Sequence, residues 1–407
     1  MKNNILSFKN DISCNNNSNT FYIDKLNLKN FRNHIDLNLK IGNSSLLIYG
    51  GNGCGKTNIL EAVSLLNQGK GIRKSNIEDY LNQKYIAEES YNIWGINADF
   101  VCPNGKFNIG TGLKEDSLKK SRVAKINTEK CSLSSLGRIL KISWITPQMC
   151  ILFQTGMNER RRFIDRLTSS LDSLHLNRVY KYEKLLRQRS KILMQFNSDK
   201  TWLDTLESQI SEFSVAITAS RLDMVQALND LYKKELNDNY LIDHFPPADI
   251  KLIGKIEELL TNKPASEVED YIKYILKKSR FSEEETISGP HKTTIEILNR
   301  KNNKNVNSAS TGEQKLLLIS IILSHARMLN KKFNMAPILL LDDIVEHLDE
   351  KHRSALFLEI SRHEGQAWFT STSKEAFAAY PTLIDKINLP KIMDLFKGKY
   401  DFQYGEV

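Results

Sequence analysis

Cysteine is scarce in this sequence, and its spacing argues against a cross-linked or zinc-bound domain. Only five cysteines occur in 407 residues, and no two of them form a C-x-x-C pair. Disulfide frameworks and cysteine zinc sites need paired or closely spaced residues. We therefore expect reduced thiols and a cytoplasmic protein. The cysteines are Cys14, Cys54, Cys102, Cys131 and Cys150.

Long apolar runs are also missing. The longest largely apolar stretch, Leu316–Leu323, is far shorter than the roughly 20 residues that a membrane-spanning helix needs. No basic segment followed by an apolar one opens the sequence, so we expect neither a membrane protein nor a secreted one. Hydrophobic residues make up 41% of the chain, which is ordinary for a globular protein of two or three domains.

Acidic residues are fewer than basic ones, with 48 against 57 and a formal net charge of +9. This balance permits a polyanionic partner, but the position of the charges matters more. Arg160–Arg166 contains four arginines, for which we keep two interpretations, an ion-pair face that ties a helical arm to the head or a DNA contact. The basic turn at Lys70–Lys74 is either a solvated loop or a phosphate contact. Lys114–Lys125 is predicted to be a hairpin or an exposed loop.

Glycine is concentrated at one place, Gly50–Thr57, which reads G-x-x-x-x-G-K-T. An apolar run precedes it and helix-forming residues follow it, which is the strand–loop–helix context of a phosphate-binding loop. We expect Lys56 to reach the β- and γ-phosphates of a nucleotide and Thr57 to bind Mg²⁺. Glycines let backbone N–H groups turn inward toward phosphate. The expected phosphate cradle consists of Gly50, Gly51, Asn52, Gly53, Cys54 and Gly55.

Two later segments complete the predicted site. Ser310 and Gly312 lie in a turn that opens an apolar helix, where free N–H groups and the helix dipole attract anions. The apolar run Pro337–Leu341 reads as a buried parallel strand and ends in two aspartates. We expect Asp342 to hold Mg²⁺ and Asp343 to orient or deprotonate the attacking water.

The sequence also predicts the order of the domains. Alternating residues at Phe21–Lys29 and Ile35–Ile41 predict two strands that join the Leu46 strand in a nucleotide-binding lobe. Heptad-like stretches at Val179–Phe196 and Leu206–Leu231 predict a short antiparallel helical hairpin with its turn at 197–200. We expect a disordered extension at 1–20, a head from 21–165 and 281–407, and a helical arm at 166–280. Gln148, just past another strand, could sense the metal.

With these residues in this order, the sequence resembles ABC-type ATPases of the SMC kind and, more closely, the RecF family of bacterial recombination mediators. The resemblance runs from Phe21 to the C-terminus. The motifs that carry it are Leu26–Asn33, Gly50–Ala62, Thr146-Pro147, Arg161–Asp165, Gly289–His291 and Leu341–Asp343.

The resemblance implies an α/β P-loop ATPase head of mixed sheet and helices with a smaller helical arm. It also implies an ATP- and Mg²⁺-dependent homodimer, in which Ser310 and Gly312 of one copy complete the Lys56 site of the other. Such a protein would bind double-stranded and gapped DNA and, with RecO and RecR, promote RecA loading during DNA repair and the SOS response.

Several positions depart from the family pattern. Asp343 stands where ABC enzymes generally have glutamate, so we expect slow, weakly DNA-stimulated hydrolysis. Ala309-Ser310-Thr311 replaces Leu-Ser-Gly. Lys292-Thr293-Thr294 follows the Gly289–His291 turn, where the family often has arginine and, two residues on, aspartate. Thr370 replaces the switch histidine of transporters, which argues against the alternative of a transporter motor subunit. Another SMC-like ATPase, or an ATP-switched DNA-binding protein that hardly hydrolyses, remains a second reading.

Overall fold

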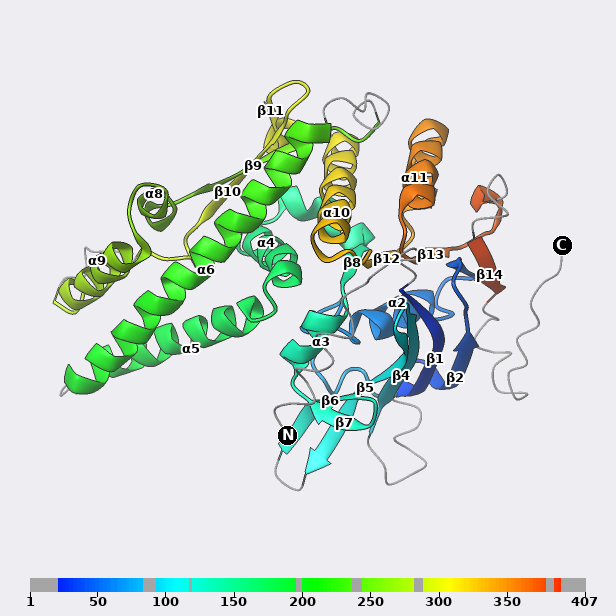
Figure 1. Cartoon of the computed structure of the whole chain (residues 1–407), viewed down its shortest axis with the longest axis horizontal. Helices are drawn as coiled ribbons and strands as arrows, with labels where there is room; N and C mark the ends of the chain where they lie inside the picture. Colours follow the sequence, from blue (N-terminus) through cyan, green and yellow to red (C-terminus); the bar gives the residue numbers. More distant parts are fainter. Residues whose placement is uncertain are drawn as a thin grey trace. The chain divides into compact units, whose positions relative to one another are not determined.

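The chain folds into two compact units. A computed structural model describes residues 21–82, 93–116, 119–194, 200–235, 244–281, 288–377 and 384–388 (Figure 1). The first unit comprises Met1–Met149 and His325–Val407, and the second comprises Cys150–Ser324. The predicted arm at 166–280 falls within the second unit, which also includes 150–165 and 281–324. The predicted extension at 1–20 lies outside the described residues.

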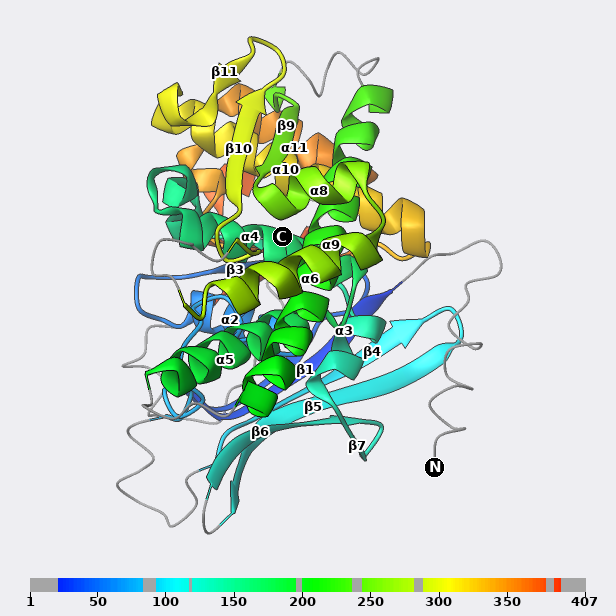
Figure 2. The ribbon, with the colours of Figure 1, turned by 90° about the vertical axis from the view of Figure 1, so that its left-hand side faces the viewer.

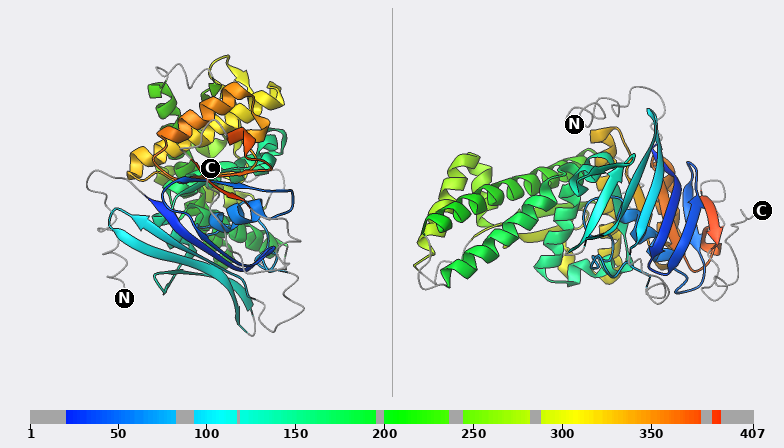
Figure 3. Two further views of the ribbon diagram at one scale, coloured as in Figure 1. Left: turned by 90° about the vertical axis from the view of Figure 1, so that its right-hand side faces the viewer. Right: turned by 90° about the horizontal axis from the view of Figure 1, so that it is seen from below.

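A six-stranded antiparallel sheet forms one layer of the first unit, in the order β2-β1-β4-β5-β6-β7 (Figure 3, left). The strands predicted at Phe21–Lys29 and Ile35–Ile41 are confirmed as β1 and β2, and Lys114–Lys125 falls in the β5–β6 hairpin. One face of β1, β2, β4 and β5 is buried, as alternation requires. The strands are β1 (Tyr22–Phe31), β2 (His34–Lys40), β4 (Gly95–Cys102), β5 (Gly105–Asp116), β6 (Lys119–Ile126) and β7 (Glu129–Cys131).

A five-stranded parallel sheet forms the second layer, in the order β14-β3-β13-β12-β8. Strand β3 belongs to this sheet and not to the sheet of β1 and β2, although all three strands lie in the first unit and share one core. Its residues Leu46, Leu47 and Ile48 are all buried, which suits a parallel strand covered on both faces. The strands are β3 (Ser45–Tyr49), β8 (Ile142–Ile145), β12 (Ile338–Leu341), β13 (Ala367–Ser371) and β14 (Ile384–Asn388).

Short helices in the first unit connect its strands, α2 and α3 between the two sheets and α11 within the parallel sheet. Helix α2 follows β3, and its residues join a core with the buried face of the antiparallel sheet. The helices are α2 (Lys56–Ser64), α3 (Leu133–Ile139) and α11 (Glu350–Arg362), with 3₁₀ turns η4 (Val345–His347) and η5 (Glu375–Phe377). The 3₁₀ helix η2 (Pro147–Gln154) and helix α10 (Thr311–Phe333) each span a boundary between the units.

The predicted helical hairpin is confirmed in the second unit as α5 (His175–Leu193) and α6 (Lys200–Glu235) (Figure 2). Most of its predicted turn lies outside the described residues. Arg189 lies within the first heptad-like stretch, Val179–Phe196. Its side chain is buried and forms an ion pair with Glu207 at 2.8 Å. The hairpin therefore has a buried ion pair within its core. The other helices are α4 (Met157–Leu171), α8 (Lys255–Asn262) and α9 (Ala265–Lys278).

The second unit also contains a small sheet in the order β11-β10-β9. From sequence alone, Thr293–Leu298 is predicted to be a strand, and β10 (Thr294–Asn299) confirms it, while β9 (Ala248–Ile253) was not predicted. The polar segment Asn299–Ser308 is predicted to be a loop, but Lys304–Asn305 forms the short strand β11 and Val306–Ser308 the 3₁₀ turn η3. Lysine and asparagine have low strand propensity, so this pairing gave no sequence signal.

None of the helices that the structure describes is both long enough and apolar enough to cross a bilayer.

Candidate functional site

The glycine-rich loop joins β3 to α2, as the sequence predicts. Gly50, Gly53 and Gly55 have φ angles of 151°, 80° and 100°, a region that side chains rarely allow. At Gly55 space is also lacking, since a Cβ atom would lie 2.5 Å from the Asn33 amide and 2.7 Å from the His34 ring. Both the backbone conformation and the close packing therefore favour glycine at position 55.

Lys56 is folded back into the loop. Its Nζ donates to the carbonyl oxygens of Gly50 at 2.8 Å and Gly51 at 3.2 Å, and the residue is 5% exposed. Helix α2 begins here, and no side chain caps its first turn. The Lys56 ammonium group and the free N–H groups at the start of α2 therefore lie together at this loop. Such an arrangement of donors binds an anion.

Thr57 connects the loop to the carboxyl end of β12. Its hydroxyl donates to Asp342 Oδ1 at 2.8 Å, across 285 positions of sequence. Thr370, at the end of the neighbouring strand β13, donates to the same oxygen at 2.8 Å. Strands β12 and β13 are parallel, so their carboxyl ends lie at one edge of the sheet. The structure therefore brings the predicted hydroxyl and carboxylate together.

Asp343 follows with a left-handed backbone, φ 48°, which is uncommon for a residue with a side chain. Its N–H donates to Thr370 Oγ1 at 2.9 Å, and the same hydroxyl lies 3.2 Å from its Oδ1. Burial raises the pKa of Asp343, and the nearby carboxylates Asp342 and Glu346 raise it further. The residue is held beside Asp342 in surroundings that disfavour its charged form.

Glu346 is a site residue that sequence reasoning missed. Its Oε1 accepts from Ser371 Oγ at 2.8 Å and Thr372 Oγ1 at 2.9 Å, and from the Thr372 backbone N–H. Although burial raises the pKa of Glu346, the hydrogen bonds from Thr372 and Ser371 hold it below its usual value. Glu346 therefore links the loop after β12 to the loop after β13. A glutamate in a short loop carries no sequence signal for such a contact.

The turn between β1 and β2 packs against the phosphate loop. His34 Nε2 lies 3.3 Å from the Gly55 carbonyl oxygen, and Asn58 donates to Asn33 Oδ1 at 2.6 Å. Burial lowers the pKa of His34 to about 4, so its ring is neutral near pH 7 and can donate to that carbonyl from Nε2. The antiparallel sheet thus supports the loop from one side.

The basic turn at Lys70–Lys74 places one residue beside α2. Arg73 donates to Asn58 Oδ1 at 2.6 Å and pairs with Glu61 at 3.2 Å, while its side chain remains 40% exposed. Glu61 is fully buried and also forms a two-pronged ion pair with Arg32, with both bonds at 2.9 Å. Arg73 is therefore not simply solvated, and its contact with phosphate stays a prediction.

Gln148 lies exposed near the start of η2. The hydrogen bonds of the described part of the chain do not join it to Thr57 or Asp342, so its role as a metal sensor stays a prediction.

The turn that contains Ser310 and Gly312 lies in the second unit. The Ser310 N–H donates to Glu313 Oε2 at 2.8 Å, and the Glu313 N–H donates to Ser310 Oγ at 3.3 Å. This reciprocal pair is a capping box, which fixes the start of α10. A Cβ atom at Gly312 would meet nothing within 4 Å. The first turn of α10 is therefore ordered by its own residues and open beside Gly312.

The arginine-rich segment makes intramolecular contacts within the second unit. Arg160 is 5% exposed and donates to Asn307 Oδ1 at 2.6 Å. Arg161 donates to the Thr293 carbonyl oxygen at 2.8 Å, and Arg162 pairs with the neighbouring Glu159. These contacts support the intramolecular interpretation over DNA contact for these side chains, and an attachment to the head stays a prediction.

Two separate sequence motifs meet at Arg221. Its Nε and Nη2 bind Asp165 at 2.8 and 2.9 Å, and its Nη1 donates to the Pro290 carbonyl oxygen at 2.6 Å. His175 contacts the same Asp165 at 2.7 Å. Burial raises the pKa of Asp165, but His175 and Arg221 together hold it below its usual value. Asp165 and the Gly289–His291 turn are thus joined by one buried charge network.

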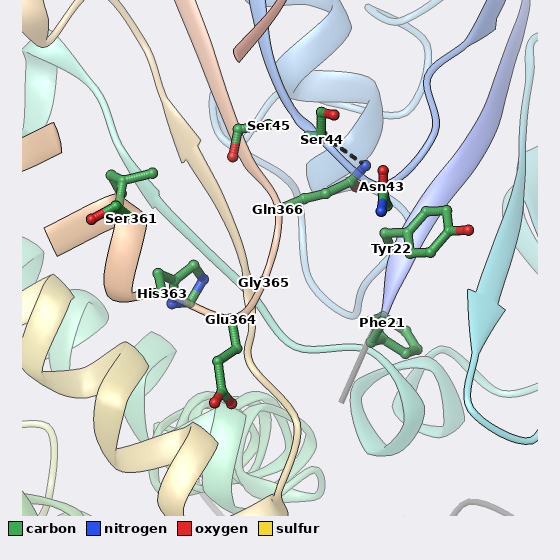
Figure 4. A pocket seen from close by; sticks show the side chains of 11 residues that line it. Phe21, Tyr22, Asn43, Ser44, Ser45, Ser361, His363, Glu364, Gly365 and Gln366 are labelled. Carbon is green, nitrogen blue, oxygen red and sulfur yellow. Dashed lines mark hydrogen bonds between the residues drawn. The ribbon is translucent and has the colours of Figure 1, made fainter. Parts of the chain in front are cut away.

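A separate hollow of about 270 Å³ opens at the amino ends of β3 and β13 (Figure 4). Gln366 reaches across it, accepting from the Ile23 N–H at 2.9 Å and donating to the carbonyl oxygens of Gly42 at 2.7 Å and Ser44 at 3.3 Å. These bonds tie the two sheets together. The hollow therefore lies at the amino ends of these strands, whereas the phosphate loop follows the carboxyl end of β3. Its polar lining is explained by the bonds of Gln366 between the sheets.

Thr57 and Asp342 fit a Mg²⁺ site that a nucleotide completes. Mg²⁺ prefers oxygen ligands and usually takes only one or two from protein, with phosphate and water supplying the rest. The two oxygens are 2.8 Å apart. Within the described residues, no group of three or more histidine, cysteine, aspartate or glutamate side chains could hold a metal. Thr57 and Asp342 therefore fit a Mg²⁺ site in which phosphate supplies further ligands, better than a site made of protein ligands alone.

Comparison with known proteins agrees with this geometry. The RecF/RecN/SMC N terminal domain family matches residues 22–388. The DNA replication and repair protein RecF of Mesorhizobium japonicum is 36% identical over 363 residues, covering 88% of this chain and 93% of its own length. The RecF of Agrobacterium fabrum is 34% identical over 366 residues, covering 89% and 95%.

Solved structures confirm the predicted fold. A structure of the recombination mediator protein RecF with ATPrS covers 91% of this chain and 96% of its own, with a TM-score of 0.75 at 21% identity. A RecF structure with ATP covers 94% and 99%, with a TM-score of 0.72 at 20% identity. The head fold of mixed sheet and helices is therefore as predicted. By sequence identity and coverage, the chain belongs to the RecF family.

Proposed function

We propose that this chain is an ATP-dependent DNA-binding protein of recombinational repair and replication-fork maintenance. The observation that carries the proposal is the hydrogen bond between Thr57 and Asp342, which joins a phosphate loop to the carboxylate that would hold its metal. The names of the curated relatives, DNA replication and repair protein RecF, support the same biology. The solved RecF structures with ATP and ATPrS support ATP as the nucleotide.

Each side chain of the site has a role that follows from its contacts. Lys56 exchanges the carbonyl oxygens of Gly50 and Gly51 for the β- and γ-phosphates. Thr57 and Asp342 hold Mg²⁺, which neutralises charge on the phosphate oxygens. Asp343 orients the attacking water or accepts its proton. Its short side chain reaches less far than glutamate, so hydrolysis is slow and serves to reset the protein.

One copy supplies only part of the γ-phosphate shell, so ATP binds between two copies. The Ser310 hydroxyl and the Gly312 N–H of the second copy provide donors at the start of α10, where the capping box keeps the turn ordered and Gly312 leaves room for close approach. ATP then favours the dimer by binding it better than the monomer.

The dimer engages DNA at single-strand gaps and, with RecO and RecR, promotes RecA loading. Contacts to DNA are mainly through phosphates and weaken with salt.

Thr370 binds Asp342 and Asp343 at the position of a transporter switch histidine, which disfavours a transporter motor role.

The experiment is a measurement of the monomer–dimer balance by analytical ultracentrifugation. The chain is compared without nucleotide and with ATP·Mg²⁺, ADP·Mg²⁺ and gapped DNA. We expect dimer with ATP·Mg²⁺, monomer with ADP, and loss of the ATP effect in Asp342→Asn. Glu350→Gln, an exposed change on α11, is the matched control. A chain that stays monomeric and binds gapped DNA equally with or without ATP·Mg²⁺ contradicts the proposal.

A further inference from the structure

The six-stranded sheet has an outward face that the nucleotide site does not use. On β1 the side chains of Leu26 and Leu28 are buried, while the alternate residues Lys25 and Lys29 are exposed. Among the side chains that the structure describes, lysines outnumber aspartates on this face. The lysines are Lys25, Lys29, Lys40, Lys106, Lys114, Lys125 and Lys130, and the aspartates are Asp24, Asp36 and Asp99.

One row of residues crosses all six strands of this face without a carboxylate. With strands about 4.8 Å apart, the row is about 24 Å long. Each asparagine amide carries two N–H donors, of which Asn38 uses one on Asp36 and Asn97 uses one on Asn108. The lysines of the row offer charge, and its glycine leaves the backbone uncovered. The register pairs Asn38 with Asn27, Asn27 with Asn97, Asn97 with Gly110, Gly110 with Lys125, and Lys125 with Lys130.

Two lysine pairs stand directly opposite each other on the same face, Lys25 with Lys40 and Lys125 with Lys130. Like charges in this position destabilise a sheet. Lys25 also stands opposite the carboxylate of Asp99 on β4, whereas the row that contains Lys125 and Lys130 has no carboxylate. Lysine on the edge strand β7 can oppose edge-to-edge pairing, but that explanation does not extend to Lys125, which lies on the interior strand β6. An anion lying across the face would neutralise Lys125 and Lys130 together.

We propose that this outward face binds the phosphate backbone of duplex DNA. The inference rests on the proposed DNA-binding function and adds the surface that performs it. A single strand is held mainly by stacking of bases on aromatic side chains. Tyr22, at the start of β1, is the one aromatic side chain on this face among the described residues. Lysine and asparagine fit phosphate oxygens, so a duplex is the occupant that the chemistry favours.

Gly110, in the middle of the row, allows a charge test that leaves the fold intact. A Cβ atom there would meet Asn97 Nδ2 at 3.6 Å, an ordinary contact, and nothing nearer. Gly110→Glu places a carboxylate in the row, and Gly110→Gln is the control of the same shape without charge. Duplex DNA binding by the full chain is measured by fluorescence anisotropy over a range of salt concentrations. We expect Gly110→Glu to bind about tenfold more weakly than Gly110→Gln at low salt, with the difference shrinking as salt rises.

A second variant counts the phosphate contacts. Lys125→Gln with Lys130→Gln removes two charges, which should reduce the slope of log affinity against log salt by about 1.8. The exposed residues Lys331 and Lys351, on α10 and α11 of the same unit, provide the control pair with equal charge loss.

The outcomes separate this inference from the proposed function. If the unmodified chain binds no duplex DNA, the proposed DNA binding fails and this surface with it. If it binds duplex, but Gly110→Glu matches Gly110→Gln and the two lysine pairs give equal slopes, the face is not the contact surface and DNA binding stands. A loss confined to single-stranded DNA would also overturn the assignment.

Discussion

Lys56 and Thr57 are adjacent, yet their side chains have different partners. Lys56 donates to carbonyl oxygens within the loop, whereas Thr57 reaches the carboxylate of Asp342 on another strand. In the proposed function, the charge that would meet phosphate and the hydroxyl that would meet metal are therefore carried by separate residues. Substitutions at the two positions should have separable effects.

The Thr57 hydroxyl should matter only when Mg²⁺ is present. Thr57→Ala should weaken ATP binding in Mg²⁺ by about tenfold or more, because one of the two protein ligands is lost. In EDTA it should match the unmodified chain. Thr57→Ser keeps the hydroxyl and serves as the control. Fluorescent-nucleotide titration with and without Mg²⁺ measures this, and an equal loss in EDTA would contradict a metal role.

His34 should make stability depend on pH. Burial lowers its pKa in the folded chain to about 4, against 6.5 for an ordinary histidine. Between these values the unfolded chain binds more protons, so stability is present above pH 6.5 and falls as pH drops toward 4. The loss attributable to His34 should be on the order of 2 to 3 kcal/mol.

Denaturant unfolding from pH 7 to pH 4.5 measures this effect. His34→Gln keeps a donor for the Gly55 carbonyl oxygen but cannot titrate, so its stability should fall less over the same range. His352→Gln, on α11, is the control for loss of a histidine elsewhere in the chain. Parallel pH curves for His34→Gln and the unmodified chain would show that His34 does not carry the effect.

At the scale of single residues, the sequence predicted the groups that belong to a motif and missed those that only support it. Lys56, Thr57 and Asp342 follow from spacing and from the chemistry of phosphate and metal. Glu346 and His34 do not, because their contacts join loops that only the folded chain brings together. Residue type alone does not encode such partners.

Arg122 shows how one strand supports another element. It lies on β6 and donates to the carbonyl oxygens of Gly69 at 2.6 Å and Asn67 at 2.9 Å, and to that of Leu65. These carbonyl groups lie at and beyond the C-terminal end of α2, where helices leave acceptors without partners. Burial lowers the pKa of Arg122 to about 10, so it remains a cation near pH 7. The antiparallel sheet thus caps the helix that carries the phosphate loop.

Loss of this cap should destabilise the chain. Arg122→Met keeps the apolar stem but leaves the carbonyl groups without their donor, which should cost about 2 to 3 kcal/mol. Arg122→Lys keeps the charge but not the planar fork, so it should restore only part of the loss. Lys125→Met, exposed on the same strand, is the control. Equal unfolding midpoints for Arg122→Met and Lys125→Met in urea would rule out the capping role.

At the scale of elements, periodicity predicted strands and helices better than it predicted their neighbours. Strand β3 was recognised, but its apolar sequence did not reveal that it pairs with β13 and β14 rather than with β1. The partners of a parallel strand are distant in sequence and leave no turn between them. The β5–β6 hairpin, whose partners are close in sequence, was predicted as one of two alternatives.

At the scale of the whole molecule, the predicted site is divided between two units. Lys56, Thr57 and Asp342 lie in the first unit, and Ser310 and Gly312 lie in the second. The motifs predicted all of these residues, but only the resemblance implied which copy of the chain each one serves. Mixing two inactive variants can answer that question.

If two copies share their sites, Lys56→Ala and Ser310→Arg should complement each other. In a mixed dimer, one site combines both substitutions, while the other combines an intact Lys56 with an intact Ser310. Random mixing at equal amounts makes half of the dimers mixed, so about a quarter of the unmodified single-turnover ATPase activity should return. Each variant alone should be inactive. The control mixes Lys56→Ala with the double variant, which leaves no intact site in any dimer and should give no recovery. If the first mixture behaves like this control although ultracentrifugation shows mixed dimers, then Lys56 and Ser310 must act within one chain, and a dimer completed by exchange between copies is wrong.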